Sequence, residues 1–461
     1  MHTDEAVNAY VVGEMLAGHP YIYDPQDRHG PVLAALAFPL ARMQGAKAFA
    51  DLTESGLRLT AVLAGTVTIL LFGAAVEVFG LTPCLIAALL FAGSPLPVYY
   101  DRYFIHESLF VAATFGLILA GGRACKKSSV AMASLAAACA ALMLACKETA
   151  VLHFFALGAA ALVFWIWNLH RRSLRGLWRP TPALAAGAVF LLLSLLLFTW
   201  FGSNWGALPA LLRAIPSFLG RAGGEGHQKP FWYYGHLLSG GWSGGLILAL
   251  AAISFMQTAI RRDPSPFGFL ALYTFFMAVF YCMIPYKTPW LALNLWLPIA
   301  LFAGLAIKSL WRVPAAHPAL RIVFPATCVL LACVVAALIA HDTRQRVFLH
   351  AADETNPYAY AHTSEDLLGL PIEIARLAQQ SGIAGPRIAV IASDPWPLPW
   401  YLRRFSRVGF WQPGQQPEPA DFYITSTEAA DQYSDRLRNF RAEFFGARPG
   451  VLILLWSSTP K

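Results

Sequence analysis

The sequence predicts a polytopic α-helical membrane protein with a small α/β domain at its C-terminal end. Of its 461 residues, 57% are apolar and 13% are charged, and the mean hydropathy is +0.52. Soluble domains carry about 25% charged residues, so this composition excludes a soluble enzyme with one small membrane anchor. It also excludes a disordered chain, because disordered chains are poor in apolar residues.

Apolar segments of about 17–25 residues fit the hydrocarbon core of a bilayer, and roughly ten such spans occur in the chain. Several are short or interrupted by proline and glycine. We expect them at 57–79, 82–98, 108–122, 130–146, 149–168, 182–201, 244–260, 267–285, 290–309 and 321–340.

Basic residues test the topology independently of hydropathy. If the spans alternate, every basic cluster falls on the same side, which makes that side cytoplasmic. The net charge of +8 therefore reflects cytoplasmic loops and not a nucleic-acid site. The clusters are Arg123, Lys126 and Lys127, then Arg171, Arg172, Arg175 and Arg179, then Arg261 and Arg262, and finally Lys308 and Arg312.

The extracytoplasmic side then receives residues 1–56, 99–107, 202–241 and 286–289, and all residues after 341. The chain already begins on this side. We therefore expect an upstream membrane helix that is missing from this reading frame, or else a short polar N-terminus that is translocated unaided.

The tail changes character after about residue 344 and divides the chain into a membrane domain, 1–344, and a soluble α/β domain, 345–461. The pattern predicts an amphipathic helix at 364–381. Short strands are expected at 387–392, 421–425 and 450–456. The seven cysteines lie in or beside apolar runs without CxxC spacing, so they indicate neither a disulfide framework nor a zinc site.

Ionisable residues gather in the predicted extracytoplasmic loops, although each group also has a purely structural interpretation. Asp4 and Glu5 belong either to a solvated N-terminal tail or to a functional site. The amphipathic stretch 32–49 favours the functional site, because it is typical of a segment that holds the N-terminal loop against the bilayer. A carboxylate-rich turn, 99–107, contains more charge than an interhelical connection needs. Its candidate residues are Asp101, Arg102, His106 and Glu107.

Three basic positions complete the set of candidates. Lys147 and Glu148 lie between two spans, where they neutralise one another, snorkel or bind a ligand. Lys287 lies between two prolines at the mouth of two helices, where an anionic headgroup would be found. Arg58, at the start of a span, is equally compatible with snorkelling and with phosphate binding.

The order of these motifs resembles that of the GT-C membrane glycosyltransferases, which include protein O-mannosyltransferases and the lipid A aminoarabinose transferase. The pattern runs from Asp-Glu through Tyr-Asp-Pro…His-Gly-Pro, Arg-Tyr-Phe-Ile-His-Glu and Lys-Glu-Thr to Tyr-Lys-Thr-Pro-Trp. A tail motif at 396–403 is most similar to the prokaryotic branch called flippase-activity-associated proteins. Two departures are the absence of a helix before the acidic pair and a glutamate, Glu107, where aspartate is common.

The resemblance implies a GT-C-like fold that transfers a sugar from a polyprenyl-phosphate donor, on the extracytoplasmic face of a prokaryotic cell membrane, to a glycan, lipid or protein acceptor. By position, Asp4 is the general base, Glu5 is its acidic neighbour, Glu107 is the second-loop acidic residue and Lys287 contacts the donor phosphate. The substrate-binding candidates are His29, Arg58, Asp101, Arg102, His106, Lys147, Glu148, Lys287 and Trp290.

The chemistry agrees with this assignment, because glycosyl transfer needs a base for the acceptor hydroxyl and cations for the departing phosphate. No glycine-rich nucleotide loop is visible, so a nucleotide-sugar donor is not favoured. No cofactor is firmly implied, although His2, His29 and His106 with nearby carboxylates are compatible with a divalent metal. Aromatic residues could stack on a sugar or form a membrane-interface belt; they are Trp205, Phe231, Trp232, Tyr233 and Tyr234.

Two other classes of function remain open. A transporter or flippase-associated protein for lipid-linked sugars would also bury charges between spans, but transporters often show internal repeats and none is evident here. A membrane scaffold would use the outer domain to bind a partner. The transferase hypothesis predicts that Asp4 and Glu107 face one extracytoplasmic cavity.

Overall fold

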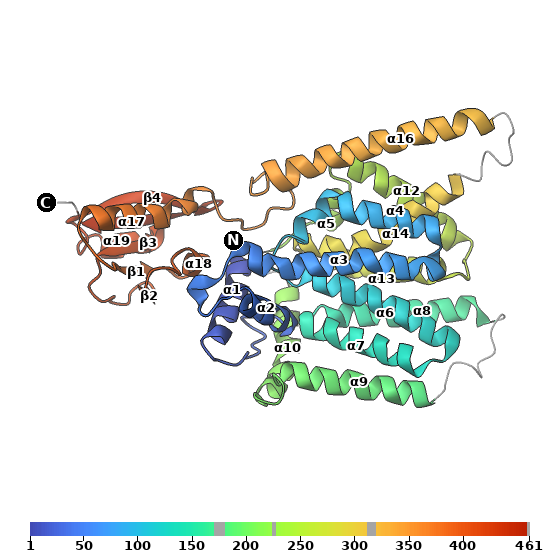
Figure 1. The fold of residues 1–461 in the computed structure, drawn as a ribbon, viewed down its shortest axis with the longest axis horizontal. Helices are drawn as coiled ribbons and strands as arrows, with labels where there is room; N and C mark the ends of the chain where they lie inside the picture. The colour runs from blue at the N-terminus through green and yellow to red at the C-terminus, as the bar shows by residue number, and fades with distance from the viewer. Residues whose placement is uncertain (170–179, 224–226, 311–319, 459–461) are drawn as a thin grey trace.

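The computed structural model describes residues 1–169, 180–223, 227–310 and 320–458, and shows a bundle of helices with a smaller α/β domain at one end (Figure 1). Five of the basic residues used for the topology, Arg171, Arg172, Arg175, Arg179 and Arg312, lie outside the described residues.

Eight helices in the described part of the chain are long and apolar enough to cross a membrane. They are α3 (Glu54–Phe79), α6 (Glu107–Lys127), α8 (Ala150–Trp167), α9 (Pro180–Phe198), α12 (Gly241–Ile260), α13 (Pro266–Met283), α14 (Ala292–Leu310) and α16 (Leu320–Thr343). Three apolar helices are shorter, namely α2 (Val32–Met43), α4 (Leu81–Gly93) and α7 (Val130–Cys146). The polytopic helical fold that the sequence predicts is therefore confirmed.

The expected spans at 82–98 and 130–146 correspond to α4 and α7. Helix α4 ends early because Pro95, which has no backbone N–H, begins a new helix, α5 (Pro95–Tyr100). Helix α14 is central, and 89% of the apolar stretch in Pro289–Leu310, which includes it, is buried. Helix α16 lies at the edge of the bundle, and 6% of the apolar stretch in Thr327–Leu349, which includes most of the helix, is buried (Figure 1).

The predicted N-terminal loop contains a helix, α1 (Thr3–Leu16), which lies between the bundle and the α/β domain (Figure 1). His2 caps it, because the His2 ring accepts from the backbone N–H of Asp4 and the Glu5 carboxylate accepts from the backbone N–H of His2. The helix buries Ala6, Ala9 and Val12 in a cluster that includes residues of both domains.

The long loop expected at 202–241 also contains helices. They are α10 (Ala207–Ala222) and α11 (Tyr233–Leu238). Backbone pairing ties the segment just before α11 to the α13–α14 connection, since Gln228 forms an antiparallel bridge with Tyr286. The loop is therefore fixed beside the mouth of α13 and α14.

The tail is an α/β domain with one five-stranded sheet in the order β2-β1-β3-β5-β4. Its strands are β1 (Arg387–Ile391), β2 (Arg407–Trp411), β3 (Phe422–Ser426), β4 (Phe440–Arg448) and β5 (Val451–Ser458), and its helices are α17 (Leu370–Gln380), α18 (Leu398–Tyr401) and α19 (Thr427–Tyr433). Strands β2, β1 and β3 are parallel, while β5 and β4 form an antiparallel hairpin.

Most tail elements match the expected positions. The three predicted strands are β1, β3 and β5, and the predicted helix at 364–381 begins later, at Leu370, after a 3₁₀ turn. The pattern missed β2 and β4. Both are edge strands of the sheet, and neither is buried along its length. Gly409 interrupts the apolar residues of β2, and Arg441 and Glu443 interrupt those of β4, so both strands lack the continuous apolar run that marked the others.

Candidate active site

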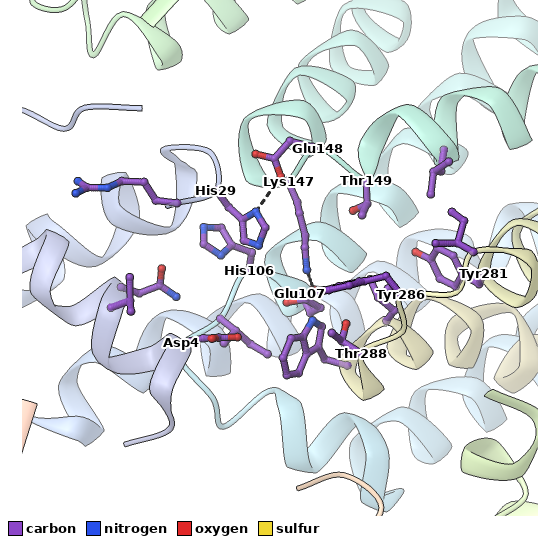
Figure 2. Close-up of a pocket in the computed structure, with 18 of the residues that line it drawn as sticks. Asp4, His29, His106, Glu107, Lys147, Glu148, Thr149, Tyr281, Tyr286 and Thr288 are labelled. Carbon is purple, nitrogen blue, oxygen red and sulfur yellow. Dashed lines mark hydrogen bonds and ion pairs between the residues drawn. The ribbon is translucent and has the colours of Figure 1, made fainter. Parts of the chain in front are cut away.

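A cavity of about 260 Å³ lies at the end of the bundle that carries α1. Segments far apart in the sequence line it: residues 27–29, Tyr234 of α11, the start of α1, the turn before α6, the α7–α8 connection and the α13–α14 connection. The last three are short connections between apolar helices that the charge-derived topology places on the side of the N-terminal segment. Figure 2 shows their polar side chains converging on this cavity.

Asp4 and Glu107, the two carboxylates predicted to share one cavity, both line it (Figure 2). Asp4 is in the first turn of α1, where the helix dipole stabilises a carboxylate. Its side chain is exposed to the cavity, and no described residue forms a hydrogen bond or ion pair with it. It is therefore free to accept a proton from a ligand.

Glu107, in contrast, is paired. Lys147 Nζ lies 2.5 Å from Glu107 Oε1, and both residues are buried. Glu107 is the first residue of α6 and Lys147 follows the last residue of α7, so each charge lies at the helix end that favours it. The Lys147 ammonium also lies 5.8 Å from the centre of the Trp290 ring.

A second pair fixes the N-terminal loop to the α7–α8 connection. His29 Nδ1 lies 2.8 Å from Glu148 Oε2, and the Tyr23 hydroxyl donates to the other oxygen of Glu148 at 3.0 Å. The contact requires close backbone approach, because the N–H of Gly30 donates to the Cys146 carbonyl at 3.2 Å. A Cβ on Gly30 would lie only 2.1 Å from the Ala145 carbonyl oxygen.

His106 contributes a neutral imidazole to the cavity wall. It is buried, and its ring packs edge-on against that of His29 at 5.3 Å. Burial, together with the nearby His29 and Lys147, holds the pKa of His106 well below its usual range. The ring can therefore donate or accept a hydrogen bond but carries no charge at neutral pH.

The far wall consists of Tyr234, Tyr281, Tyr286, Thr288 and Trp290. Tyr234 donates its hydroxyl to the Thr288 carbonyl at 3.1 Å. The indole N–H of Trp290 is buried without an acceptor among the described residues, and this donor is thus available to a ligand.

Five predicted site residues are not brought to the cavity. Glu5 is buried in a bidentate ion pair with Arg58, both contacts being 2.8 Å, and also accepts from the backbone N–H of Phe104. Burial alone would raise the pKa of Glu5, but the hydrogen bonds and charge of Arg58 lower it to about 2. Glu5 and Arg58 thus join α1 to α3, and neither is free to bind a ligand.

Asp101, Arg102 and Lys287 also lie away from the cavity lining. Asp101 packs against Gly65 of α3, and burial raises the pKa of Asp101 to about 7. Arg102 donates to the Val347 carbonyl at 3.2 Å. Lys287 is 1% exposed and donates to the carbonyls of Ile284 and Lys229 at 2.5 and 3.3 Å, so its predicted contact with a phosphate is not formed here.

Several lining residues were not among the predicted site residues. Tyr234 was noted only as a possible sugar-stacking residue, and Ile105, Thr149, Tyr286 and Thr288 only as members of the quoted motifs. The others are Val7, Asn8, Asp27, Arg28, Leu152, Tyr281, Ile284 and Leu291. The other aromatic residues of that group do not line the cavity, and Trp205, Phe231 and Trp232 are exposed.

The histidines that the sequence left compatible with a divalent metal do not converge, and among the described residues no group of three or more His, Cys, Asp or Glu side chains is placed to hold an ion. His2 lies apart from His29 and His106, because its Nε2 contacts the Tyr360 carbonyl.

Comparison with known proteins agrees with this architecture. Residues 35–200 match the family described as dolichyl-phosphate-mannose-protein mannosyltransferase. None of the curated proteins matches the chain by sequence.

Among solved structures, ArnT from Cupriavidus metallidurans in the apo state is similar, with a TM-score of 0.65 at 14% identity over 98% of this chain and 93% of that chain. The same protein bound to undecaprenyl phosphate has a TM-score of 0.62 at 15% identity, again over 98% of this chain and 93% of that chain. The archaeal oligosaccharyltransferase AglB from Archaeoglobus fulgidus, in complex with an inhibitory peptide and a dolichol-phosphate, gives 0.54 at 12% identity over 99% of this chain and 70% of that chain. This chain therefore has a GT-C-like fold.

Proposed function

We propose that the protein transfers a sugar from a polyprenyl-phosphate donor to a hydroxyl of an extracytoplasmic acceptor, with Asp4 as the general base. The observation that carries this proposal is the unpaired Asp4 carboxylate in a cavity whose other carboxylates are paired or hydrogen-bonded. The match of residues 35–200 to a mannosyltransferase family supports the same reaction class.

The proposed step needs one base and one anion-binding region. Asp4 accepts the proton of the acceptor hydroxyl, and the acceptor oxygen forms a bond to the anomeric carbon of the sugar. The bond from that carbon to the phosphate oxygen breaks, and its electron pair stays on the departing lipid phosphate. A base in hydrogen-bond reach typically contributes about 10²–10⁴-fold to the rate.

The cations that line the cavity are Arg28 and Lys147, and they replace Lys287 as the proposed phosphate ligands. Lys147 also pairs with Glu107, which fixes its ammonium in place before the donor arrives. The Trp290 N–H and the neutral His106 offer further hydrogen bonds to phosphate or sugar oxygens.

The topology from the basic residues supports an active site and an α/β domain, 345–461, on the outer face of a prokaryotic cell membrane. A lipid-linked donor explains why the cavity lies at the end of the helix bundle. The tail motif 396–403 supports a place in the flippase-activity-associated branch. A glycan, lipid or protein is the proposed acceptor.

The test is transfer from a panel of radiolabelled polyprenyl-phosphate sugars in membranes that contain the protein. The matched pair is Asp4→Asn and Glu14→Gln, since both residues are on α1 but Glu14 does not line the cavity. We expect Asp4→Asn to lose at least about 100-fold in rate at equal protein level, and Glu14→Gln to retain activity. Equal transfer by wild type and Asp4→Asn would refute the assigned base.

A further inference from the structure

Behind the cavity wall, a buried histidine lies between two tyrosine hydroxyls that the proposed reaction does not use. His153 is in the first turn of α8 and is fully excluded from solvent. Its Nδ1 lies 2.7 Å from the Tyr273 hydroxyl and its Nε2 lies 2.8 Å from the Tyr281 hydroxyl. Tyr281 lines the cavity, whereas Tyr273 does not.

The hydrogen-bond requirements of Tyr273 select the tautomer of His153. A neutral imidazole has one N–H donor and one acceptor nitrogen. Tyr273 is 1% exposed, and among the described residues its hydroxyl has no hydrogen-bond partner other than His153. If Nδ1 carried the proton, the buried hydrogen of Tyr273 would have no acceptor, which native cores avoid.

The tautomer with the proton on Nε2 satisfies Tyr273 and both ring nitrogens of His153. Tyr273 then donates to Nδ1, and Nε2–H donates to the Tyr281 oxygen. Protonation of both ring nitrogens is disfavoured, because no described carboxylate contacts His153 to balance the positive charge of an imidazolium. The Tyr281 oxygen is thus an acceptor toward His153, and its own hydrogen points elsewhere.

The open side of Tyr281 is the cavity. Figure 2 shows its oxygen turned toward the other labelled cavity residues. The neighbouring Tyr234 is not available in the same way, because it donates to the Thr288 carbonyl. Leu152 and Ile284 line the same cavity and supply apolar surface, where a hydrogen bond to a ligand is stronger than in water.

We propose that Tyr281, oriented by His153, donates its hydroxyl hydrogen to an acceptor oxygen of the bound lipid-linked sugar donor, either on the phosphate or on the sugar. The proposal rests on the glycosyltransferase function proposed above. Tyr281 is then a ligand-binding residue and His153 a positioning residue, and the Nε2–H tautomer is the feature that connects them.

Binding measurements on purified protein in lipid nanodiscs test the contact. The probes are undecaprenyl phosphate alone and an undecaprenyl-phosphate sugar that the wild type uses in transfer. We expect Tyr281→Phe to weaken binding about 10-fold or more. Loss with both probes places the acceptor oxygen on the phosphate, and loss with the sugar-bearing probe alone places it on the sugar.

The matched control is Tyr273→Phe, which removes the same group from the same histidine but does not touch the cavity. It keeps the Tyr281 hydroxyl and should weaken binding less than Tyr281→Phe. Solid-state ¹⁵N NMR of labelled histidine, with the His153 signal assigned by its absence in His153→Gln, should show the Nε2–H tautomer in the wild type. In Tyr273→Phe a second tautomer should appear.

Two results would overturn the inference: equal binding of both probes by wild type and Tyr281→Phe, or a proton on Nδ1 of His153 in the wild type. A wild-type protein that binds neither probe and transfers no sugar would refute the proposed function together with this inference. The two failures are therefore distinguishable.

Discussion

Lys147 and Glu107 form a buried ion pair within the cavity wall, with 2.5 Å between Nζ and Oε1. The pair joins the end of α7 to the start of α6, so it is part of both the structure and the proposed phosphate site. Loss of one partner leaves an uncompensated charge in a poorly solvated place, whereas loss of both does not.

Lys147→Met should therefore lower the free energy of unfolding by about 3–5 kcal/mol. The double variant Glu107→Gln/Lys147→Met should recover much of that stability and remain inactive, because the cation is still absent. Thermal unfolding in detergent, followed beside transfer activity, measures both effects. Lys308→Met, which changes a lysine outside the cavity, serves as the control, and equal melting of Lys147→Met and Lys308→Met would contradict the role of the pair.

Glu5 gives a prediction about acid stability. Its pKa in the folded protein is about 2, against an ordinary value of 4.5, despite burial and because of Arg58. A lowered folded-state pKa contributes stability that is present above 4.5 and is lost as the pH falls toward 2. The difference corresponds to roughly 3 kcal/mol at neutral pH.

Wild type should therefore lose stability more steeply than Glu5→Gln as the pH falls below about 4.5. The measurement is the unfolding midpoint of each protein in denaturant at a series of pH values. Glu14→Gln, also on α1, should follow the wild-type profile. Parallel profiles of wild type and Glu5→Gln would mean that the Glu5–Arg58 pair does not govern acid stability.

Gly30 is predicted to tolerate no side chain. A Cβ there would meet the Ala145 carbonyl oxygen at 2.1 Å, so Gly30→Ala must separate the N-terminal loop from the α7–α8 connection. The His29–Glu148 contact should break with it, and both stability and transfer should fall. Gly121, inside α6, has no atom within 4 Å of the corresponding position.

Gly121→Ala is therefore the matched control, and it should stabilise the protein by about 0.5–1 kcal/mol through its better helix propensity. Melting temperatures and transfer rates of the two variants decide the question. A Gly30→Ala protein as stable and active as the wild type would show that the close approach to Ala145 is not required.

The sequence predicts those features of the site that depend on patterns averaged over many residues. Apolar spans and basic loops are long-range averages, so they correctly brought the loops of Asp4, Glu107, Lys147 and Trp290 to one end of the bundle. They carry no information on the direction of a single side chain. Asp4 and Glu5 are adjacent on a helix and so point about 100° apart; one lines the cavity and the other pairs with Arg58.

The same limit explains Lys287. The α13–α14 connection pairs with residue 228 in an extended conformation, in which successive side chains point to opposite sides. Tyr286 and Thr288 therefore line the cavity while Lys287 points away from it. Sequence spacing showed a cation between two prolines, but the direction of that cation depends on a backbone pairing with a distant loop.

The α/β domain leads to a last prediction, because it contacts the helix that carries Asp4. Trp400 of α18 is 1% exposed and packs in the cluster that includes Ala6 and Ala9 of α1. Its ring also stacks under the Arg403 guanidinium at 3.7 Å and lies 5.9 Å from the Phe49 ring. Trp400→Ala should therefore loosen α1, at a cost of about 3–5 kcal/mol for the lost packing.

The expected result is faster amide hydrogen exchange in residues 3–16 and slower transfer, with the transmembrane helices unchanged. Trp456→Ala is the control, because Trp456 packs in a separate cluster of the same domain and bonds to Thr425 at 2.9 Å, away from α1. It should speed exchange in the sheet alone. If Trp400→Ala and Trp456→Ala gave the same exchange in residues 3–16, the domain would not be what holds Asp4 in the cavity.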